Sequence, residues 1–142
     1  MKEMIYLDNA ATTRVSESVL NEMLPCFTKY YGNASGVYTL ADHSRKLIEI
    51  SRERVAKAIN ARSNEIYFVS GGSEADNLAI KGVARANKKR GNHIITTKIE
   101  HKAVLETCRA LEREGFEVTY LNVMPNGMIN IEELKRAIKK SN

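Results

Sequence analysis

The strongest constraint on the fold is an alternation of two hydrophobic patterns along the second half of the chain. Runs rich in β-branched and aromatic residues at positions 65–70, 94–99 and 118–123 predict strands. Between them, residues 73–90 and 102–114 repeat apolar residues at helical spacing. Strands joined by helices in this way are typical of a parallel sheet, so the chain is predicted to be an α/β protein. Three strands make an incomplete sheet, since about two or three more are expected in a stable domain of this class.

The remaining elements are predicted from caps and breakers. Residues 4–7 predict a short strand. Helices are predicted over 16–31 and 43–60, separated by a long loop at 32–42 that is rich in glycine and small polar residues. A last helix is predicted over 130–140, because Asn130 is a good N-cap and an apolar helical pattern follows it.

Composition argues against several classes of function. The 142 residues include 22 basic and 17 acidic side chains, for a net charge of +5. The basic residues are mixed with glutamates on the predicted helices, which is typical of a solvated surface and not of a nucleic-acid-binding patch. No apolar stretch approaches the roughly 18 residues of a membrane span, and no secretory signal is visible. The expectation is a cytoplasmic protein with no direct nucleic-acid or membrane partner.

Cysteine and histidine are too sparse to indicate a disulfide framework or a metal site. Cys26 and Cys108 are far apart in the sequence, and His43, His93 and His101 show no ligand spacing. Both cysteines fall within predicted helices, with no neighbouring cation or helix N-terminus to lower the pKa of the thiol. They are predicted to be packed core thiols, and no metal is expected.

The Ser-Gly-Gly-Ser-Glu segment at residues 70–74 joins a predicted strand to a predicted helix. Free backbone N–H groups and the helix dipole at such a junction favour an anion, and the Ser73 hydroxyl adds a donor. The lysine of a P-loop and the glycine spacing of the dinucleotide fingerprint are both missing. The segment by itself leaves two interpretations of equal weight: a phosphate-binding turn, or an ordinary tight turn in which Ser73 caps the helix.

His101 follows the predicted strand at 94–99. In an open α/β sheet, ligands bind beyond the carboxyl ends of the strands, so His101 is expected at the same rim as the glycine turn. A flat imidazole there could stack on an aromatic ring or carry a proton. Equally, His101 could be a helix N-terminal residue that only bonds its neighbours.

Several motifs occur together and in order: residues 6–13, 32–35, 70–77, 96–104 and 108–121. In this combination the chain resembles the NifS/IscS group of cysteine desulfurases, within the class V aminotransferase superfamily. The resemblance extends over essentially the whole sequence. It implies the large domain of the fold-type-I transferases that depend on pyridoxal phosphate, with an incomplete parallel sheet and flanking helices. Residues 1–14 would border the active site, and residues 15–142 would form the first portion of the cofactor-binding large domain.

The resemblance also implies an activity. Enzymes of this group are homodimers that remove sulfur from L-cysteine, leaving L-alanine and a persulfide on an enzyme cysteine. The sulfur passes to acceptor or scaffold proteins for iron–sulfur clusters or thio-modified RNA.

By the same resemblance, specific positions receive roles. Gly72 and Ser73 would hold the cofactor phosphate, at positions where the group usually has Ala and Thr. His101 would stack on the pyridine ring and assist proton transfer as a catalytic residue. The substrate site would be bordered by Asn9, Ala10 and Ala11.

One part of the pattern is absent. The group's Schiff-base lysine lies in a Ser-x-His-Lys segment, which this sequence does not contain, and its persulfide cysteine is likewise expected further along a longer chain. The 142 residues are therefore expected to be part of a longer enzyme, to be inactive alone, and to bind pyridoxal phosphate weakly or not at all. The alternative is a non-catalytic module that binds a phosphate ligand or another protein.

Overall fold

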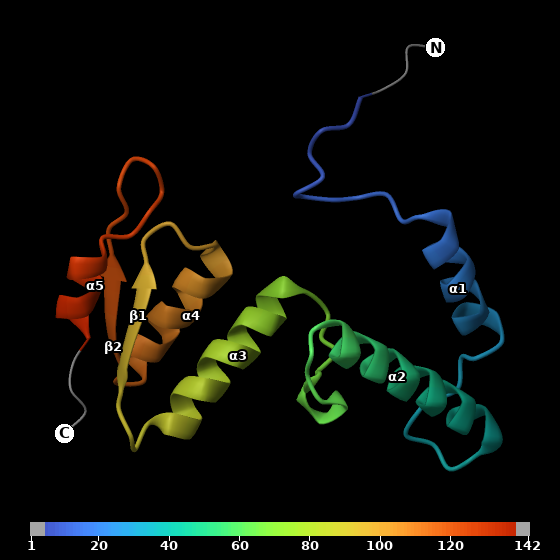
Figure 1. Cartoon of the computed structure of the whole chain (residues 1–142). Helices are drawn as coiled ribbons and strands as arrows, with labels where there is room; N and C mark the ends of the chain where they lie inside the picture. The colour runs from blue at the N-terminus through green and yellow to red at the C-terminus, as the bar shows by residue number, and fades with distance from the viewer. Residues whose placement is uncertain (1–4, 139–142) are drawn as a thin grey trace. The chain divides into compact units, whose positions relative to one another are not determined.

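The computed structural model describes residues 5–138. They fall into two compact units, Met1–Tyr67 and Phe68–Asn142, and Figure 1 labels the helices and strands of each. The first unit is helical, and the second combines helices with a parallel strand pair, which confirms the α/β class. No helix within 5–138 has the length and hydropathy to cross a membrane. The boundary between these units does not test the prediction that residues 1–14 border the active site and residues 15–142 begin the large domain, which stays a prediction.

The first unit contains α1 (Glu17–Thr28), α2 (Thr39–Ala58) and a short 3₁₀ turn, η1 (Ser63–Glu65). The predicted N-cap of α1 is confirmed, because Ser16 Oγ accepts from the N–H of Val19. Helix α2 begins earlier than predicted, at Thr39, with Tyr38 as its N-cap.

Arg45 of α2 connects this helix to the preceding loop. Its Nε donates to the carbonyl of Ala34 (2.9 Å) and its Nη2 to the carbonyl of Gly36 (2.6 Å). A guanidinium presents several donors in a fixed geometry, so it can satisfy two loop carbonyls at once. The loop between α1 and α2 therefore has a defined course.

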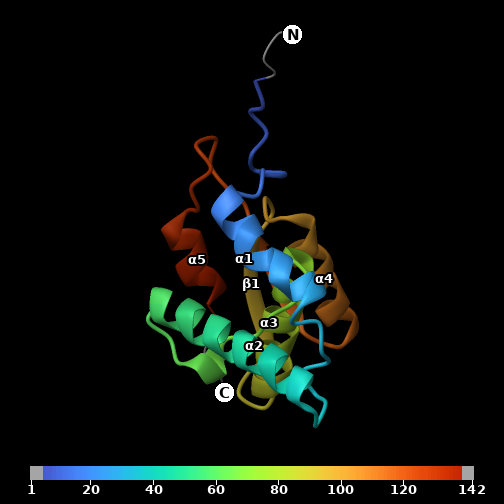
Figure 2. The ribbon, with the colours of Figure 1, turned by 90° about the vertical axis from the view of Figure 1, so that its right-hand side faces the viewer.

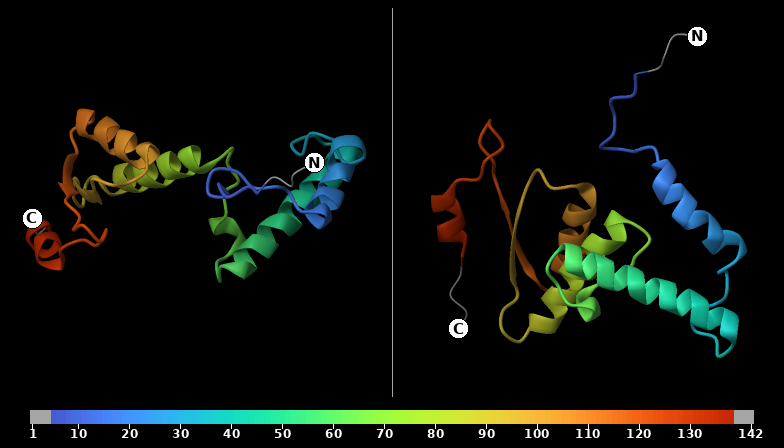
Figure 3. Two further views of the ribbon diagram at one scale, coloured as in Figure 1. Left: turned by 90° about the horizontal axis from the view of Figure 1, so that it is seen from above. Right: turned by 45° about the vertical axis from the view of Figure 1, so that its right-hand side comes forward.

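The second unit contains α3 (Gly72–Asn87), β1 (His93–Thr97), α4 (Lys102–Arg113), β2 (Glu117–Leu121) and α5 (Ile131–Ala137). Strands β1 and β2 pair in parallel, and α4 is the crossover that joins them. Helices α4 and α5 lie on opposite sides of the strand pair (Figures 1 and 2), and α3 lies alongside α4 (Figure 3).

The core of the second unit is the apolar stripe of α4. Leu111 is 0% exposed and Cys108 1%, and both project from the same side of the helix. Phe116 and Leu121, from the segment after the helix, are also buried. Gly115 ends the helix with φ +88°, a left-handed conformation that favours glycine, and β2 follows directly.

The predicted strand at 65–70 is wrong. Residues 63–65 form the 3₁₀ turn, and residues 66–69 have no regular structure. A β-rich sequence becomes a strand only when another strand pairs with it, and among residues 5–138 β1 and β2 pair with each other and not with this segment. Its aromatic side chains are accordingly exposed, Tyr67 by 72% and Phe68 by 53%.

The first predicted strand also fails where it can be checked. Residues 5–7 have no strand structure, and position 4 lies outside the described residues. The last helix is confirmed at its start, since Asn130 Oδ1 accepts from the N–H groups of Glu132 (2.9 Å) and Glu133 (3.3 Å). It ends at Ala137, and positions 139–140 of the prediction are outside the described range.

We expect the stability of the second unit to depend on Leu111 far more than on another helical leucine. Leu111→Ala removes a fully buried side chain and should lower the free energy of unfolding by about 2–5 kcal/mol. Leu78 of α3 is 53% exposed, so Leu78→Ala is the matched control and should cost less than about 1 kcal/mol. Hydrogen exchange of the β1 and β2 amides measures this unit separately. Equal acceleration of exchange in the two variants would contradict the assignment of the core.

Candidate functional site

The turn before α3 is held by Glu74, the third residue of the helix. Its Oε2 accepts from the N–H of Ser70 (2.7 Å) and from the Ser70 hydroxyl (2.6 Å). These two hydrogen bonds stabilise the ionised carboxylate and lower the pKa of Glu74, with the hydroxyl contributing most. The carboxylate therefore stays charged at neutral pH and keeps the turn closed.

The N-terminus of α3 keeps its own donors available. The first N–H groups of any α-helix lack an acceptor within the helix. Here the N-cap is Gly71, which has no side chain to supply one. A Cβ at Gly71 or Gly72 would meet nothing within 4 Å, so the backbone is open to close approach. The φ of 168° at Gly71 is extended backbone that any residue adopts, so these glycines expose N–H groups and do not relieve strain.

His101 is the N-cap of α4. Its Nδ1 accepts from the N–H of Ala103 (3.1 Å), which places the proton of the neutral ring on Nε2. The turn before it is ordered by Thr97, whose hydroxyl donates to Glu100 Oε1 (2.8 Å). His101 is exposed, and its Nε2 is the ring nitrogen that this hydrogen bond leaves free.

Ser73 and His101 line the same hollow, which has a volume of about 470 Å³. The α3 side also contributes Asn77 and Lys81, at successive spacings of four residues that place them on one face of the helix with Ser73. The other lining residues, all from α4, are Lys102, Ala103, Glu106 and Thr107. The structure thus brings together two of the residues predicted for the site. Gly72 is the first residue of α3 and precedes Ser73, without lining the hollow itself.

The charge of the hollow suits an anion. Lys81 and Lys102 contribute two cations, and the one lining carboxylate, Glu106, forms an ion pair with Arg109. Thr107 Oγ1 is buried and has no hydrogen-bond partner within residues 5–138. A donor-rich concavity with little free negative charge favours a phosphate over a cationic ligand.

Sequence reasoning missed the contribution of Lys81 and Lys102. The spacing of Lys81 from Ser73, eight positions on one helix, is a signal that could have found it. Lys102 is the first residue of α4 and directly follows the N-cap His101, so its position in the hollow depends on where the helix begins.

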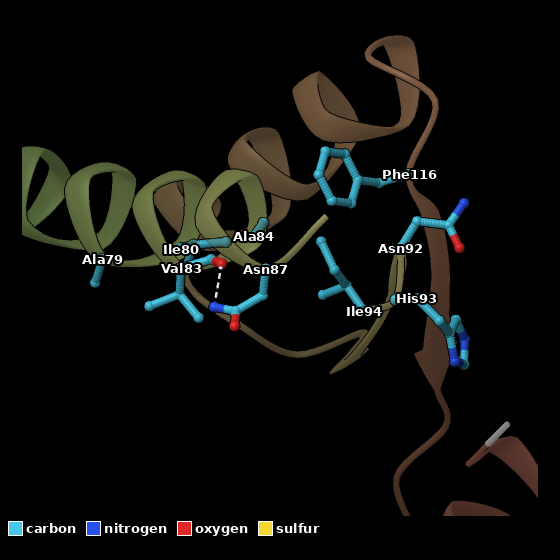
Figure 4. A pocket seen from close by; sticks show the side chains of 10 residues that line it. Ala79, Ile80, Val83, Ala84, Asn87, Asn92, His93, Ile94 and Phe116 are labelled. Atoms are coloured by element: carbon cyan, nitrogen blue, oxygen red, sulfur yellow. Dashed lines mark hydrogen bonds between the residues drawn. The ribbon is translucent and has the colours of Figure 1, made fainter. Parts of the chain in front are cut away.

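A second hollow of about 470 Å³ lies between α3 and β1 (Figure 4). It is lined mainly by apolar side chains, including Ile80, Val83, Ile94 and Phe116. His93 also lines it, and the Nε2 of this residue forms a hydrogen bond with the Thr119 hydroxyl at 2.8 Å. Apolar walls of this kind suit the packing of other apolar side chains. The hollow of Ser73 and His101 is therefore the better candidate for a charged ligand.

Asn9, Ala10 and Ala11 belong to the first unit. They form part of a turn in which the N–H of Ala11 donates to the carbonyl of Asp8 (3.1 Å). Asn9 Oδ1 accepts from the Thr13 hydroxyl (3.1 Å), so its amide is partly engaged. Their place at a substrate site stays a prediction.

The two cysteines differ. Cys108 is buried as predicted, and burial raises the pKa of its thiol, with smaller contributions from Glu112 and Glu100. It is therefore a neutral packing residue and a poor nucleophile. Cys26 is exposed, contrary to the prediction, because α1 has no buried residue. No group of three metal-ligating side chains occurs in the described part of the chain.

The comparisons with known proteins agree on one family. The family pattern described as "Aminotransferase class-V" matches residues 5–142. The chain is 56% identical over 138 residues to "Cysteine desulfurase IscS" of Clostridium botulinum, covering 97% of this chain and 35% of that protein. Among solved structures, a "NIFS-LIKE PROTEIN" matches with TM-score 0.87 and 40% identity, covering 94% of this chain and 36% of that one.

A further solved structure, "SspA in complex with cysteine", matches with TM-score 0.83 and 39% identity, covering 93% of this chain and 38% of that one. The chain thus spans about a third of the length of the relatives that it matches. Because the family pattern extends from residue 5 to residue 142, the chain belongs to the aminotransferase class-V family.

Proposed function

We propose that this chain forms one wall of the pyridoxal-phosphate site of a cysteine desulfurase. The observation that carries the proposal is the shared hollow of Ser73 and His101, two residues from the N-termini of neighbouring helices. The names of the relatives support the reaction, and the neighbour solved with cysteine supports L-cysteine as substrate. The products would be L-alanine and an enzyme persulfide.

The phosphate end of the cofactor would bind at the start of α3. The N–H groups of Gly72 and Ser73 and the Ser73 hydroxyl are donors at the positive end of the helix dipole. The open space beside Gly72 allows an oxyanion to approach the backbone. The donor set therefore fits a phosphate.

The ring end would lie against His101. The bond from the Ala103 N–H to Nδ1 fixes the imidazole, so a flat face is available for stacking. The same bond leaves Nε2 to hold or move a proton. Pyridoxal phosphate, when bound, supplies the electron sink for the reaction at the substrate carbon.

The other parts of the proposal follow from the family. Asn9, Ala10 and Ala11 would border the substrate, residues 1–14 would reach the active site, and residues 15–142 would begin the large domain. The whole enzyme would be a cytoplasmic homodimer that passes sulfur to acceptor or scaffold proteins for iron–sulfur clusters or thio-modified RNA.

We expect Ser73 and His101 to contribute to different ends of the ligand. Pyridoxine 5′-phosphate is a suitable probe, because it has the ring and the phosphate but no aldehyde to react with surface lysines. Ser73→Ala should weaken its binding about tenfold or more, since a hydrogen bond to a charged group is lost. The same variant should bind inorganic phosphate more weakly by the same factor. His101→Ala, in contrast, should bind pyridoxine 5′-phosphate more weakly and inorganic phosphate as well as the unchanged protein does. Titration of ¹⁵N-labelled protein, followed at the amides of residues 71–74, measures both.

Pyridoxine without phosphate is the control ligand and should leave these amides unchanged. Lys135→Ala, a change of a surface cation on α5, is the control variant. The sequence left open whether these residues bind the cofactor weakly or not at all, and the open N-terminus of α3 favours weak binding. The proposal is therefore contradicted if pyridoxine 5′-phosphate at millimolar concentration shifts none of the four amides, or if Ser73→Ala binds it as well as the unchanged protein.

We also expect no desulfurase activity from the 142 residues alone. The sequence has no Ser-x-His-Lys segment, and Cys108 is a buried, neutral thiol. Sulfide release from L-cysteine with added pyridoxal phosphate should equal the rate with the cofactor alone. A higher rate that His101→Ala abolishes would show that these residues suffice for the reaction.

A further inference from the structure

Glu74 occupies an unusual place in the cap of α3. In a capping box, the N-cap side chain accepts from an N–H of the first turn, and a glutamate at the third position reaches back to the N-cap N–H. Here the N-cap is Gly71, and Glu74 reaches one residue further, to the N–H and the hydroxyl of Ser70. The carboxylate thus closes the turn without occupying the first N–H groups of the helix.

The cap of α5 shows the ordinary arrangement. There Asn130 Oδ1 accepts from the N–H groups of Glu132 and Glu133. Glu133 holds the third helical position, as Glu74 does in α3, but no hydrogen bond of its carboxylate to the cap is recorded in residues 5–138. In α5 the protein satisfies its own helix donors, and in α3 it leaves them open.

Ser70 is the side chain nearest to a conventional cap of α3. A serine close to a helix start readily accepts from the first N–H groups. The hydroxyl of Ser70 instead donates to Glu74 at 2.6 Å, and its N–H donates to the same oxygen at 2.7 Å. Both polar groups of Ser70 are therefore drawn to the carboxylate and away from the helix N-terminus.

We infer that Glu74 is a positioning residue for the phosphate site: it retains Ser70 in the turn, so that the first N–H groups of α3 and the Ser73 hydroxyl stay available to the anion. This inference rests on the proposed function. A carboxylate one residue from Ser73 also repels a phosphate, so its net effect on binding has two opposed parts. If charge dominates, removing Glu74 strengthens binding; if positioning dominates, removing it weakens binding.

The experiment is a titration of the 142-residue chain with pyridoxine 5′-phosphate, followed at the amides of residues 71–74. Glu74→Ala should weaken binding about tenfold, although it removes a negative charge. Glu74→Gln should recover part of the loss, because its amide oxygen can still accept from the Ser70 N–H. Glu133→Ala, at the same position of α5, should leave binding unchanged.

A double variant separates positioning from a general loss of structure. If the freed Ser70 hydroxyl occupies the helix N-terminus in Glu74→Ala, then Ser70→Ala in that background should restore much of the binding. A disordered turn would not be rescued in this way. The amide proton of Ser70 gives an independent readout without ligand, since its shift should move upfield when the charged acceptor is lost.

The outcomes are distinguishable. If the unchanged protein shows no phosphate-dependent shift at residues 71–74, the proposed function fails. If the unchanged protein binds and Glu74→Ala binds equally or more tightly, the inference about Glu74 is overturned and the proposed function stands. Weaker binding in Glu74→Ala that Ser70→Ala does not restore would also overturn it.

Discussion

The arrangement of the second unit depends on the packing of α4 against its strand pair. Leu111 and Cys108 are buried on one side of this helix, and the parallel pairing of β1 with β2 fixes its two ends. The N-terminus of α4 therefore lies just beyond the carboxyl end of β1, where His101 caps it. Because α3 packs beside α4, the start of a second helix lies at the same hollow. The candidate site follows from two helix N-termini held by one core.

The two helix starts are used differently. At the start of α4, a side chain supplies an acceptor for one of the N–H groups that lack a partner within the helix, since His101 Nδ1 accepts from the N–H of Ala103. That bond determines which edge of the imidazole is free. At α3, glycine at the N-cap leaves the donors open, and Glu74 stabilises the turn from the other side. One helix start orients an imidazole, which the proposal places against the cofactor ring, and the other leaves backbone groups available to an anion.

Local signals in the sequence predicted the local features well. Asn130 as a cap, Gly115 as a helix end and the helix predicted over 73–90 all depend on short-range chemistry, and each is found, the helix over Gly72–Asn87. The strand predicted at 65–70 depends on a partner that is not sequence-local, and the segment stays without regular structure. Exposure of Cys26 has the same cause, because the apolar side of α1 is not covered by other described residues.

The site was predictable only in part. The sequence order placed His101 and the glycine turn at one rim, and the structure brings Ser73 and His101 to one hollow. The place of Lys81 in this hollow depends on the face of α3 that it shares with Ser73, which becomes clear only once the helix is known. The hydrogen bonds of Glu74 required the backbone course of the turn, which no spacing rule predicts when the N-cap is glycine.

The central claim is that the ring of a pyridoxal-type ligand lies against His101. Nuclear Overhauser effects between the 2-methyl protons of pyridoxine 5′-phosphate and histidine ring protons test it directly. The account predicts a cross-peak to His101 and none to His93, which lines the apolar hollow between α3 and β1. A cross-peak to His93 alone, or to neither ring while the phosphate remains bound, would contradict it.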